Sequence, residues 1–242
     1  LETFLQLIDD ADVMSGWNSE GFDIPYLVNR IARVLGKEHT RRFCLWGKYP
    51  NRREFERYGK AQETYDTVGR LHLDYMELYR KYTYHEMHSY SLDAIGEYEL
   101  GERKTEYQGT LDQLYNNDFE TFIQYSRQDV DLLVRMDKKL QFIDLANVIA
   151  HDNTVLVQTT MGAVAVTDQA IINEAHSRGL ICPDKVHDKT QKHYPQTCTA
   201  AGAYVATPKK GFHEWIGSMD LNSLYPSILR SLNMSTETIV GQ

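Results

Sequence analysis

Ser218-Met219-Asp220-Leu221-Asn222-Ser223-Leu224-Tyr225-Pro226-Ser227-Ile228 carries the strongest sequence pattern in this chain, and the expected fold is built from it. Residues 215–221 predict a short strand, and the Tyr-Pro turn that follows begins an apolar run suited to a helix, so Asp220 falls at a strand end. Open sheets place their ligands at strand ends. A carboxylate fixed there can hold a hard divalent cation, and the N–H groups of residues 221–225 can point at phosphate oxygens. The alternative, from residue types alone, is an Asp220 that only caps the helix.

The pattern Asp-x-x-Ser-Leu-Tyr-Pro-Ser at residues 220–227 resembles the first polymerase motif of family B DNA polymerases. Such a pattern is far more specific than a lone acidic residue. The resemblance implies that Asp220 binds metal and that Tyr225 is a steric gate against a ribose 2′-hydroxyl. A deoxynucleoside triphosphate would be cradled by Leu221, Ser223, Leu224 and Tyr225. The alternative for Tyr225 is a core aromatic.

Composition indicates a globular chain of one or two domains, because 242 residues with 42% hydrophobic content suffice for real cores. No apolar run reaches about 18 residues and no signal peptide is evident, so no membrane partner is expected. The chain starts at Leu1 and stops soon after its best motif, which suggests an internal fragment. The net charge of -8 hides basic stretches at 41–60 and 185–210, which are compatible with phosphate binding as well as with solvated faces.

The cysteines predict a reducing compartment, because three of them without CxxC spacing form no disulfide framework. Zinc-competent residue types do occur together at Cys182, His187, His193 and Cys198. Their spacings are not the short ones that pre-form structural sites, so no zinc is predicted.

Residues 13–18 predict a short strand, and residues 19–22 predict a turn into a helix. Asp23 is placed as the N-cap of that helix and Gly36 as its end. Its apolar face is predicted to consist of Leu27, Ile31, Val34 and Leu35. Whether Asp23 does more than cap is left open by these residues alone.

A second helix is predicted over residues 119–140, with a start signal in Asn117-Asp118. Its apolar positions are Phe119, Phe122, Ile123, Val130, Leu133 and Leu140. Tyr125 and Asp129 are four residues apart, so they project from one face. Such a pair is usually only a pair of surface neighbours.

Asn18-x-x-x-Phe22-Asp23 and Tyr125-x-x-x-Asp129 resemble the second and third exonuclease motifs of the same polymerases. The resemblance implies that Asp23 and Asp129 hold metal and that Tyr125 orients the attacking water. It also implies that Asn18 and Phe22 shape the site for the primer end.

Weaker matches lie between and after these motifs. Residues 73–79 and 91–95 look like further exonuclease segments, and Lys104 sits where phage members place a lysine near the scissile phosphate.

Residues 52–63 suggest either a polar hairpin turning at Tyr58-Gly59 or a loose surface loop. In T-even-like phage polymerases such a hairpin helps part the primer from the template, which implies DNA contacts from Arg52 and Tyr58. Gly202 and Tyr204 resemble a template-contacting motif.

The closest likeness is to the T-even-like bacteriophage group. It implies an α/β fold: a ribonuclease-H-like 3′-5′ exonuclease domain, incomplete at its N-terminus, over residues 1–147. A helical connector at 148–191, with helices at 142–149 and 164–175, and the start of a polymerase palm at 192–242 complete the expected organisation.

The expected parent protein is a replicative DNA-directed DNA polymerase with proofreading, using two Mg²⁺ or Mn²⁺ ions per site. Its partners would be primer-template DNA, deoxynucleoside triphosphates, and a sliding clamp with other replisome proteins, in the cytoplasm of an infected bacterium. Because Asp23 and Asp129 supply half a metal cage and Asp220 stands nearly alone, the chain by itself is expected to have little activity. The alternatives are a stand-alone ribonuclease-H-like exonuclease with a structural Asp220 segment, and a non-enzymatic DNA-binding replication protein.

Overall fold

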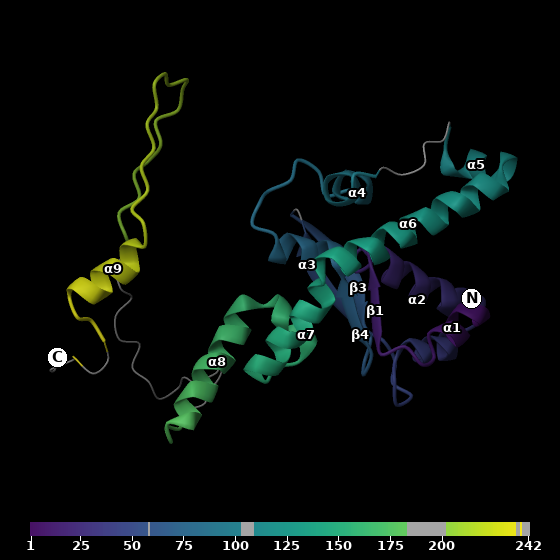
Figure 1. The fold of residues 1–242 in the computed structure, drawn as a ribbon, viewed down its shortest axis with the longest axis horizontal. Helices are drawn as coiled ribbons and strands as arrows, with labels where there is room; N and C mark the ends of the chain where they lie inside the picture. Colours follow the sequence, from purple (N-terminus) through teal and green to yellow (C-terminus); the bar gives the residue numbers. More distant parts are fainter. Residues whose placement is uncertain (58, 103–108, 183–201, 236–237, 239–242) are drawn as a thin grey trace. The chain divides into compact units, whose positions relative to one another are not determined.

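The computed structural model describes residues 1–57, 59–102, 109–182, 202–235 and 238. The chain divides into two compact units, residues 1–184 and 185–242. Figure 1 shows the first unit with its helices around short strands.

The first unit begins with α1 (Glu2–Leu7), β1 (Val13–Gly16), α2 (Asp23–Val34) and the 3-10 helix η1 (Lys37–Phe43). The predicted strand and the helix that ends before Gly36 are confirmed. The buried face of α2 is Ile24, Val28 and Ile31, which pack with Leu5 and Phe43. Val34 is 53% exposed, so its predicted place on that face is wrong.

Asp23 is not the N-cap of α2, contrary to the prediction. The N-cap is Phe22, and Asp23 is the first helical residue. The physical reason is that a capping Asp23 would find no free donor. The N–H of Ile24 donates to Ser19 O, Pro25 has no N–H, and the N–H of Tyr26 donates to Phe22 O.

The strands of the described residues form two small sheets. β1 pairs in parallel with β4 (Leu71–Asp74), with Val13 opposite Leu71 and Gly16 opposite Asp74. β2 (Asn51–Arg57) pairs antiparallel with β3 (Lys60–Asp66). The polar hairpin is therefore confirmed and the loose loop is wrong. Gly59, at φ +69°, supplies the left-handed conformation that the tight turn requires.

Four helices follow: α3 (Tyr75–Tyr82), α4 (Leu92–Leu100), α5 (Leu111–Asn117) and α6 (Phe119–Leu140). The bounds predicted for α6 are confirmed, and Asp118 caps it by accepting from the N–H of Thr121. The buried side chains of α6 are Leu132 and Met136, whereas Val130 is 63% exposed. The main core lies between α3, α4 and α6 and includes Tyr75, Tyr79, Ile95 and Met136.

The first unit ends with α7 (Phe142–Asn153), the 3-10 helix η2 (Val157–Met161) and α8 (Ala163–Ser177). The two predicted helices are confirmed and are longer than expected. α8 buries no residue and exposes Val164 and Ile171.

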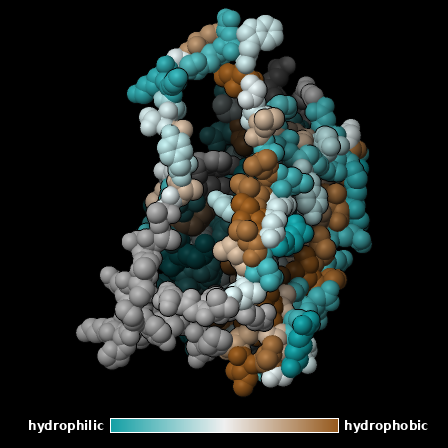
Figure 2. All heavy atoms as spheres, turned by 90° about the vertical axis from the view of Figure 1, so that its left-hand side faces the viewer, coloured by the Kyte–Doolittle hydropathy of each residue, from teal (hydrophilic) through white to brown (hydrophobic). Residues whose placement is uncertain are grey.

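Figure 2 shows apolar side chains, in brown, among polar ones on one face of the molecule. Among the described residues, no helix combines the length and apolarity that crossing a bilayer requires.

The second unit contains α9 (Leu224–Ser231), which confirms the predicted helix, but Tyr225 and Pro226 lie inside its first turn and not in a turn that precedes it. The strand predicted over residues 215–221 is wrong, because these residues are exposed and assigned to no strand. An extended segment becomes a strand only when a neighbour accepts and donates its ladder hydrogen bonds, and the described part of this unit supplies none. Asp220 therefore lies in an irregular segment three residues before Ser223, the N-cap of α9.

Candidate functional site in the first unit

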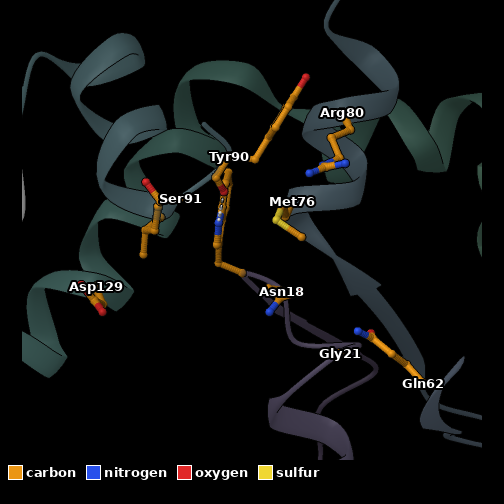
Figure 3. A pocket seen from close by; sticks show the side chains of 10 residues that line it. Asn18, Gly21, Gln62, Met76, Arg80, Tyr90, Ser91 and Asp129 are labelled. Carbon is orange, nitrogen blue, oxygen red and sulfur yellow. Dashed lines mark hydrogen bonds between the residues drawn. The ribbon is translucent and has the colours of Figure 1, made fainter. Parts of the chain in front are cut away.

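A cavity of about 610 Å³ opens between the loop after β1, the hairpin, α3, the start of α4 and α6. Figure 3 shows Asp129 of α6 on one side, Gln62 of β3 on the other, and Asn18 between them. The remaining lining residues are Trp17, Gly21, Met76, Arg80, Tyr90, Ser91 and Leu92. Segments distant in the sequence thus meet around one space, and two of the predicted site residues, Asn18 and Asp129, line it.

Asp74, at the end of β4, fixes the loop that carries Asn18. Its Oδ1 accepts hydrogen bonds from the N–H of Asn18 at 2.9 Å and of Met76 at 3.0 Å, and its Oδ2 accepts from the N–H of Glu20 at 3.0 Å. The same side chain is the N-cap of α3. One buried carboxylate therefore sets both the loop after β1 and the start of the helix that lines the cavity.

His72, on the same strand as Asp74, holds the loop at a second point. Its Nε2 lies 2.9 Å from Ser19 Oγ, and Ser19 is buried. Gly16 lies beside this contact, because a Cβ there would come within 2.8 Å of Ser19 Cβ. The close approach of β1 to the loop thus requires a glycine.

Burial is the main cause of the pKa shifts of Asp74 and His72, which hold the loop after β1. Desolvation raises the pKa of Asp74 to about 6, against the three backbone hydrogen bonds, which lower it. Desolvation also lowers the pKa of His72, because the charged imidazolium is the form that burial disfavours. Asp23 has an exposed side chain, but neighbouring protein partly desolvates its carboxylate and raises its pKa.

Tyr90 is held from two sides at the wall of the cavity. The indole N–H of Trp17 donates to Tyr90 O at 3.0 Å, and the guanidinium of Arg80 lies 4.0 Å from the centroid of the Tyr90 ring. A stacked guanidinium keeps its charge while its position is fixed. Arg80 therefore places a positive charge on the side of the cavity opposite Asp129 (Figure 3).

Three other predicted exonuclease residues, Tyr125, Phe22 and Asp23, do not line this cavity. Tyr125 is half-buried on α6, one turn before Asp129. Asp23 lies in the first turn of α2, next to Phe22, whose ring is 63% exposed. The ring of Phe22 stacks on Tyr26 with centroids 6.0 Å apart and planes at 7°. This exposed aromatic pair offers a surface on which a base can stack.

Asp23 and Asp129 are the candidate metal ligands of this unit. Carboxylate oxygens are the donors that Mg²⁺ and Mn²⁺ prefer, so the donor type fits the expected ions. Within the described ranges, no group of three or more His, Cys, Asp or Glu side chains is arranged to hold a metal ion. The donor chemistry of the two carboxylates therefore suits these ions.

The remaining predicted residues are placed elsewhere. Arg52 is ion-paired with Glu54 and Glu63 on its own hairpin. In the second unit Asp220 and Ser223 are exposed, as are Leu221, Leu224 and Tyr225, and Tyr225 is 72% exposed. Tyr204 is 92% exposed, and nothing lies within 4 Å of a Cβ built on Gly202. Tyr58, Lys104, His187, His193 and Cys198 lie outside the described residues; Cys182 is exposed.

Sequence reasoning missed most of the residues that build the site, among them Asp74, Arg80 and Gln62. Asp74 ends an apolar strand and precedes a helix, which is the signal of a capping carboxylate at a strand end. Arg80 and Gln62 carry no signal of this kind. Only their place around the cavity identifies them.

Two comparisons of the sequence extend this description. The family model described as DNA polymerase family B, exonuclease domain, matches residues 1–95. The model described as DNA polymerase family B matches residues 154–242. The two matches lie in the order in which the exonuclease and polymerase motifs were found.

Similar proteins include viral and cellular polymerases. The DNA-directed DNA polymerase of Enterobacteria phage T4 is 33% identical over 95% of this chain and 25% of its own length. That of Escherichia phage RB69 is 33% identical over 95% of this chain and 24% of its own length. The DNA polymerase delta catalytic subunit of Drosophila melanogaster is 28% identical over 96% of this chain and 22% of its own length. The chain thus spans about a quarter of the length of these relatives.

Proposed function

Because the chain belongs to DNA polymerase family B, we propose that it is part of a DNA-directed DNA polymerase that also proofreads with a 3′-5′ exonuclease. The protein proposed to contain this chain is called the parent polymerase below. One observation carries the exonuclease assignment: Asn18 and Asp129, from the two exonuclease-like motifs, line the same cavity. Coming from distant parts of the sequence, they are brought together only by the fold.

In the proposed exonuclease site, Asp23 and Asp129 hold divalent cations together with further ligands of the parent polymerase. The bound ions would neutralise the scissile phosphate and activate the attacking water. Tyr125 holds that water in line, Asn18 and Phe22 hold the last nucleotide, and Arg80 offers a cation to the phosphate backbone. Lys104 is proposed as a second cation near the scissile phosphate.

In the proposed polymerase site, at the start of a palm domain in residues 192–242, Asp220 is a metal ligand. Residues 221–225 cradle the triphosphate of the incoming nucleotide at the N-terminus of α9, where backbone N–H groups are free to bind anions. Tyr225 contacts the sugar, and Gly202 and Tyr204 contact the template. Arg52 and Tyr58 of the hairpin are proposed to contact DNA near the primer end.

The proposed substrates are primer-template DNA and deoxynucleoside triphosphates. A sliding clamp and other replisome proteins are proposed as partners, and the cytoplasm of an infected bacterium as the location. These follow from the likeness to phage polymerases rather than from a contact in the structure.

The test is excision of a mismatched, 5′-labelled primer by the purified parent polymerase. We expect shortening in Mg²⁺ or Mn²⁺, none in a chelator, and recovery when either ion is returned. Asp129→Ala should abolish the shortening in every condition. Excision that persists in the chelator, or in Asp129→Ala, would show that the exonuclease assignment is wrong.

A further inference from the structure

Glu20 is bound through three different groups to three different elements. Its main-chain N–H donates to Asp74 Oδ2 at 3.0 Å, at the end of β4. Its main-chain O accepts from Thr64 Oγ1 at 2.8 Å, on β3. Its carboxylate forms an ion pair with the guanidinium of Arg53, on β2. Glu20 thus joins the loop after β1 both to the sheet behind it and to the hairpin beside it.

The two hairpin residues that bind Glu20 face each other across the hairpin. Arg53 and Thr64 are register partners, so their side chains leave the same face. Thr64 is 1% exposed, and Arg53 also donates to Asp66 Oδ1 at 2.9 Å. A buried hydroxyl and a guanidinium shared between two carboxylates make this a fixed attachment rather than a passing surface contact.

The attachment affects the shape of the cavity because Gln62, which lines it, lies on the same strand as Thr64. On a strand, residues two apart lie on the same face, so Gln62 leaves β3 on the side from which Thr64 reaches Glu20. Gln62 lines the cavity together with Asn18 and Gly21, which flank Glu20 in the loop. The position of Thr64 therefore determines where the hairpin wall of the cavity, at Gln62, lies relative to the loop.

We propose that Arg53 and Thr64 are positioning residues that, through Glu20, hold the hairpin and the loop of residues 18–22 as one unit. The inference rests on the proposed exonuclease function and names residues that act through others. A mismatched duplex end has to be unpaired before its last nucleotide enters the cavity, and a fixed hairpin wall assists that step. A single strand enters without it.

The experiment compares Thr64→Val with Thr64→Ser in the parent polymerase, on a single-stranded oligonucleotide and on a mismatched primer-template. Valine keeps the shape and removes the hydroxyl, and serine keeps the hydroxyl. We expect Thr64→Val to lower kcat/KM for the mismatched duplex about tenfold, the factor that corresponds to one lost buried hydrogen bond. Excision of the single strand and primer extension should stay within about twofold, and Thr64→Ser should restore the duplex rate.

Thr67→Val is the matched control. The Thr67 hydroxyl is also buried and donates to a main-chain oxygen, Arg70 O at 2.8 Å, but it does not reach Glu20. It should cost similar stability and leave the ratio of duplex to single-strand excision unchanged. If Thr64→Val does not fold, Arg53→Gln removes the ion pair on the exposed side and should shift the same ratio in the same direction.

Different results would overturn the positioning role and the proposed exonuclease function. An equal loss on both substrates, an unchanged ratio, or a Thr64→Ser variant that behaves like Thr64→Val would overturn the positioning role. A wild-type parent polymerase with no metal-dependent excision of single-stranded DNA would instead overturn the proposed exonuclease, whatever the variants do.

Discussion

The main-chain N–H of Asn18 donates to Asp74 Oδ1 at 2.9 Å, across a separation of 56 residues. The bond crosses from the loop after β1 to the end of β4. Because Asn18 lines the cavity and Asp74 is 7% exposed behind it, a buried carboxylate sets the geometry of a residue that is open to ligand. Several expected outcomes depend on this contact and on others like it.

Asp74→Ala should lower the free energy of unfolding by about 3 kcal/mol, because three main-chain N–H groups lose their acceptor. Urea unfolding of the chain followed by circular dichroism measures this. Asp152→Ala, on an exposed position of α7, should stay within about 0.5 kcal/mol of the unmodified chain. Equal losses in the two variants would mean that Asp74 is not the clamp described here.

The stability of the chain should depend on pH through Asp74. Its folded pKa is raised from 3.8 to about 6, so the folded state binds the proton more tightly than the unfolded state. The resulting stabilisation, about 3 kcal/mol, is present below about pH 4 and is lost as the pH rises through about 6.

The measurement for this pH dependence is urea unfolding of the unmodified chain and of Asp74→Asn at pH 4.5 and 7.5. The unmodified chain should lose more stability than the variant on going to the higher pH. His72, whose pKa is lowered, contributes in the opposite direction, but it is present in both proteins and cancels in the difference. Identical pH profiles would contradict the assignment to Asp74.

Arg70→Met should destabilise the chain by about 3 kcal/mol, because a buried guanidinium holds three main-chain oxygens. Arg70 is 3% exposed and donates to Ala11 O at 2.6 Å, Arg42 O at 2.8 Å and Asp9 O at 3.0 Å. Arg70→Lys should recover less than half of the loss, since an ammonium cannot reproduce the planar fork. Arg178→Met, whose ion pair with Glu174 is largely exposed, is the control and should cost no more than about 0.5 kcal/mol.

Asp129→Ala and Asp23→Ala in the parent polymerase should each reduce excision at least about 100-fold while leaving primer extension within about twofold. The reason is that their carboxylates belong to the first compact unit, whereas Asp220 belongs to the second. Parallel assays of excision and extension on one labelled primer-template measure both activities. Loss of extension in either variant would refute the assignment of the two carboxylates to proofreading.

Tyr225→Ala in the parent polymerase should raise ribonucleotide incorporation relative to deoxynucleotide incorporation, because the ring occupies the volume that a 2′-hydroxyl needs. The alternative of a core aromatic would cost about 3 to 5 kcal/mol on truncation. It finds no support in the second unit, where Tyr225 is 72% exposed. The ratio of the two incorporation rates is the measurement, with Tyr225→Phe as the control that keeps the ring. A lower total activity at an unchanged ratio would contradict the gate.

Elements whose signals are local were predicted from the sequence. The helix over residues 119–140 has its cap, Asp118, next to it and its hydrogen bonds within itself, so both of its ends were predicted correctly. The hairpin turning at Gly59 was one of two alternatives left open by the sequence, and the structure decided for it over a loose loop. The exonuclease-like motifs and the polymerase-like motif that follows them could also be identified from the sequence, because each is a pattern of residues close together in the chain.

Other features depend on partners far away in the chain, and these were wrong or missed. The segment 215–221 has strand-like residues but no pairing neighbour within the described part of its unit, so it forms no strand. Asp23 has the residue type of an N-cap, yet the N–H groups of Ile24 and Tyr26 donate to Ser19 and Phe22, so the donors that an N-cap would use are taken. In both cases the backbone partners, rather than the residue type, determined the result.

The candidate chemical groups of this protein could be identified from motif spacing and helix caps, because these signals act over a few residues. Which of these groups meet depends on the tertiary fold. It brought Asn18, Gln62 and Asp129 to one cavity and placed Asp74 and Glu20 behind it. A buried polar side chain must find its hydrogen-bond partners wherever the fold supplies them, and two of the three donors to Asp74 are 56 and 54 residues away, beyond the reach of any local pattern.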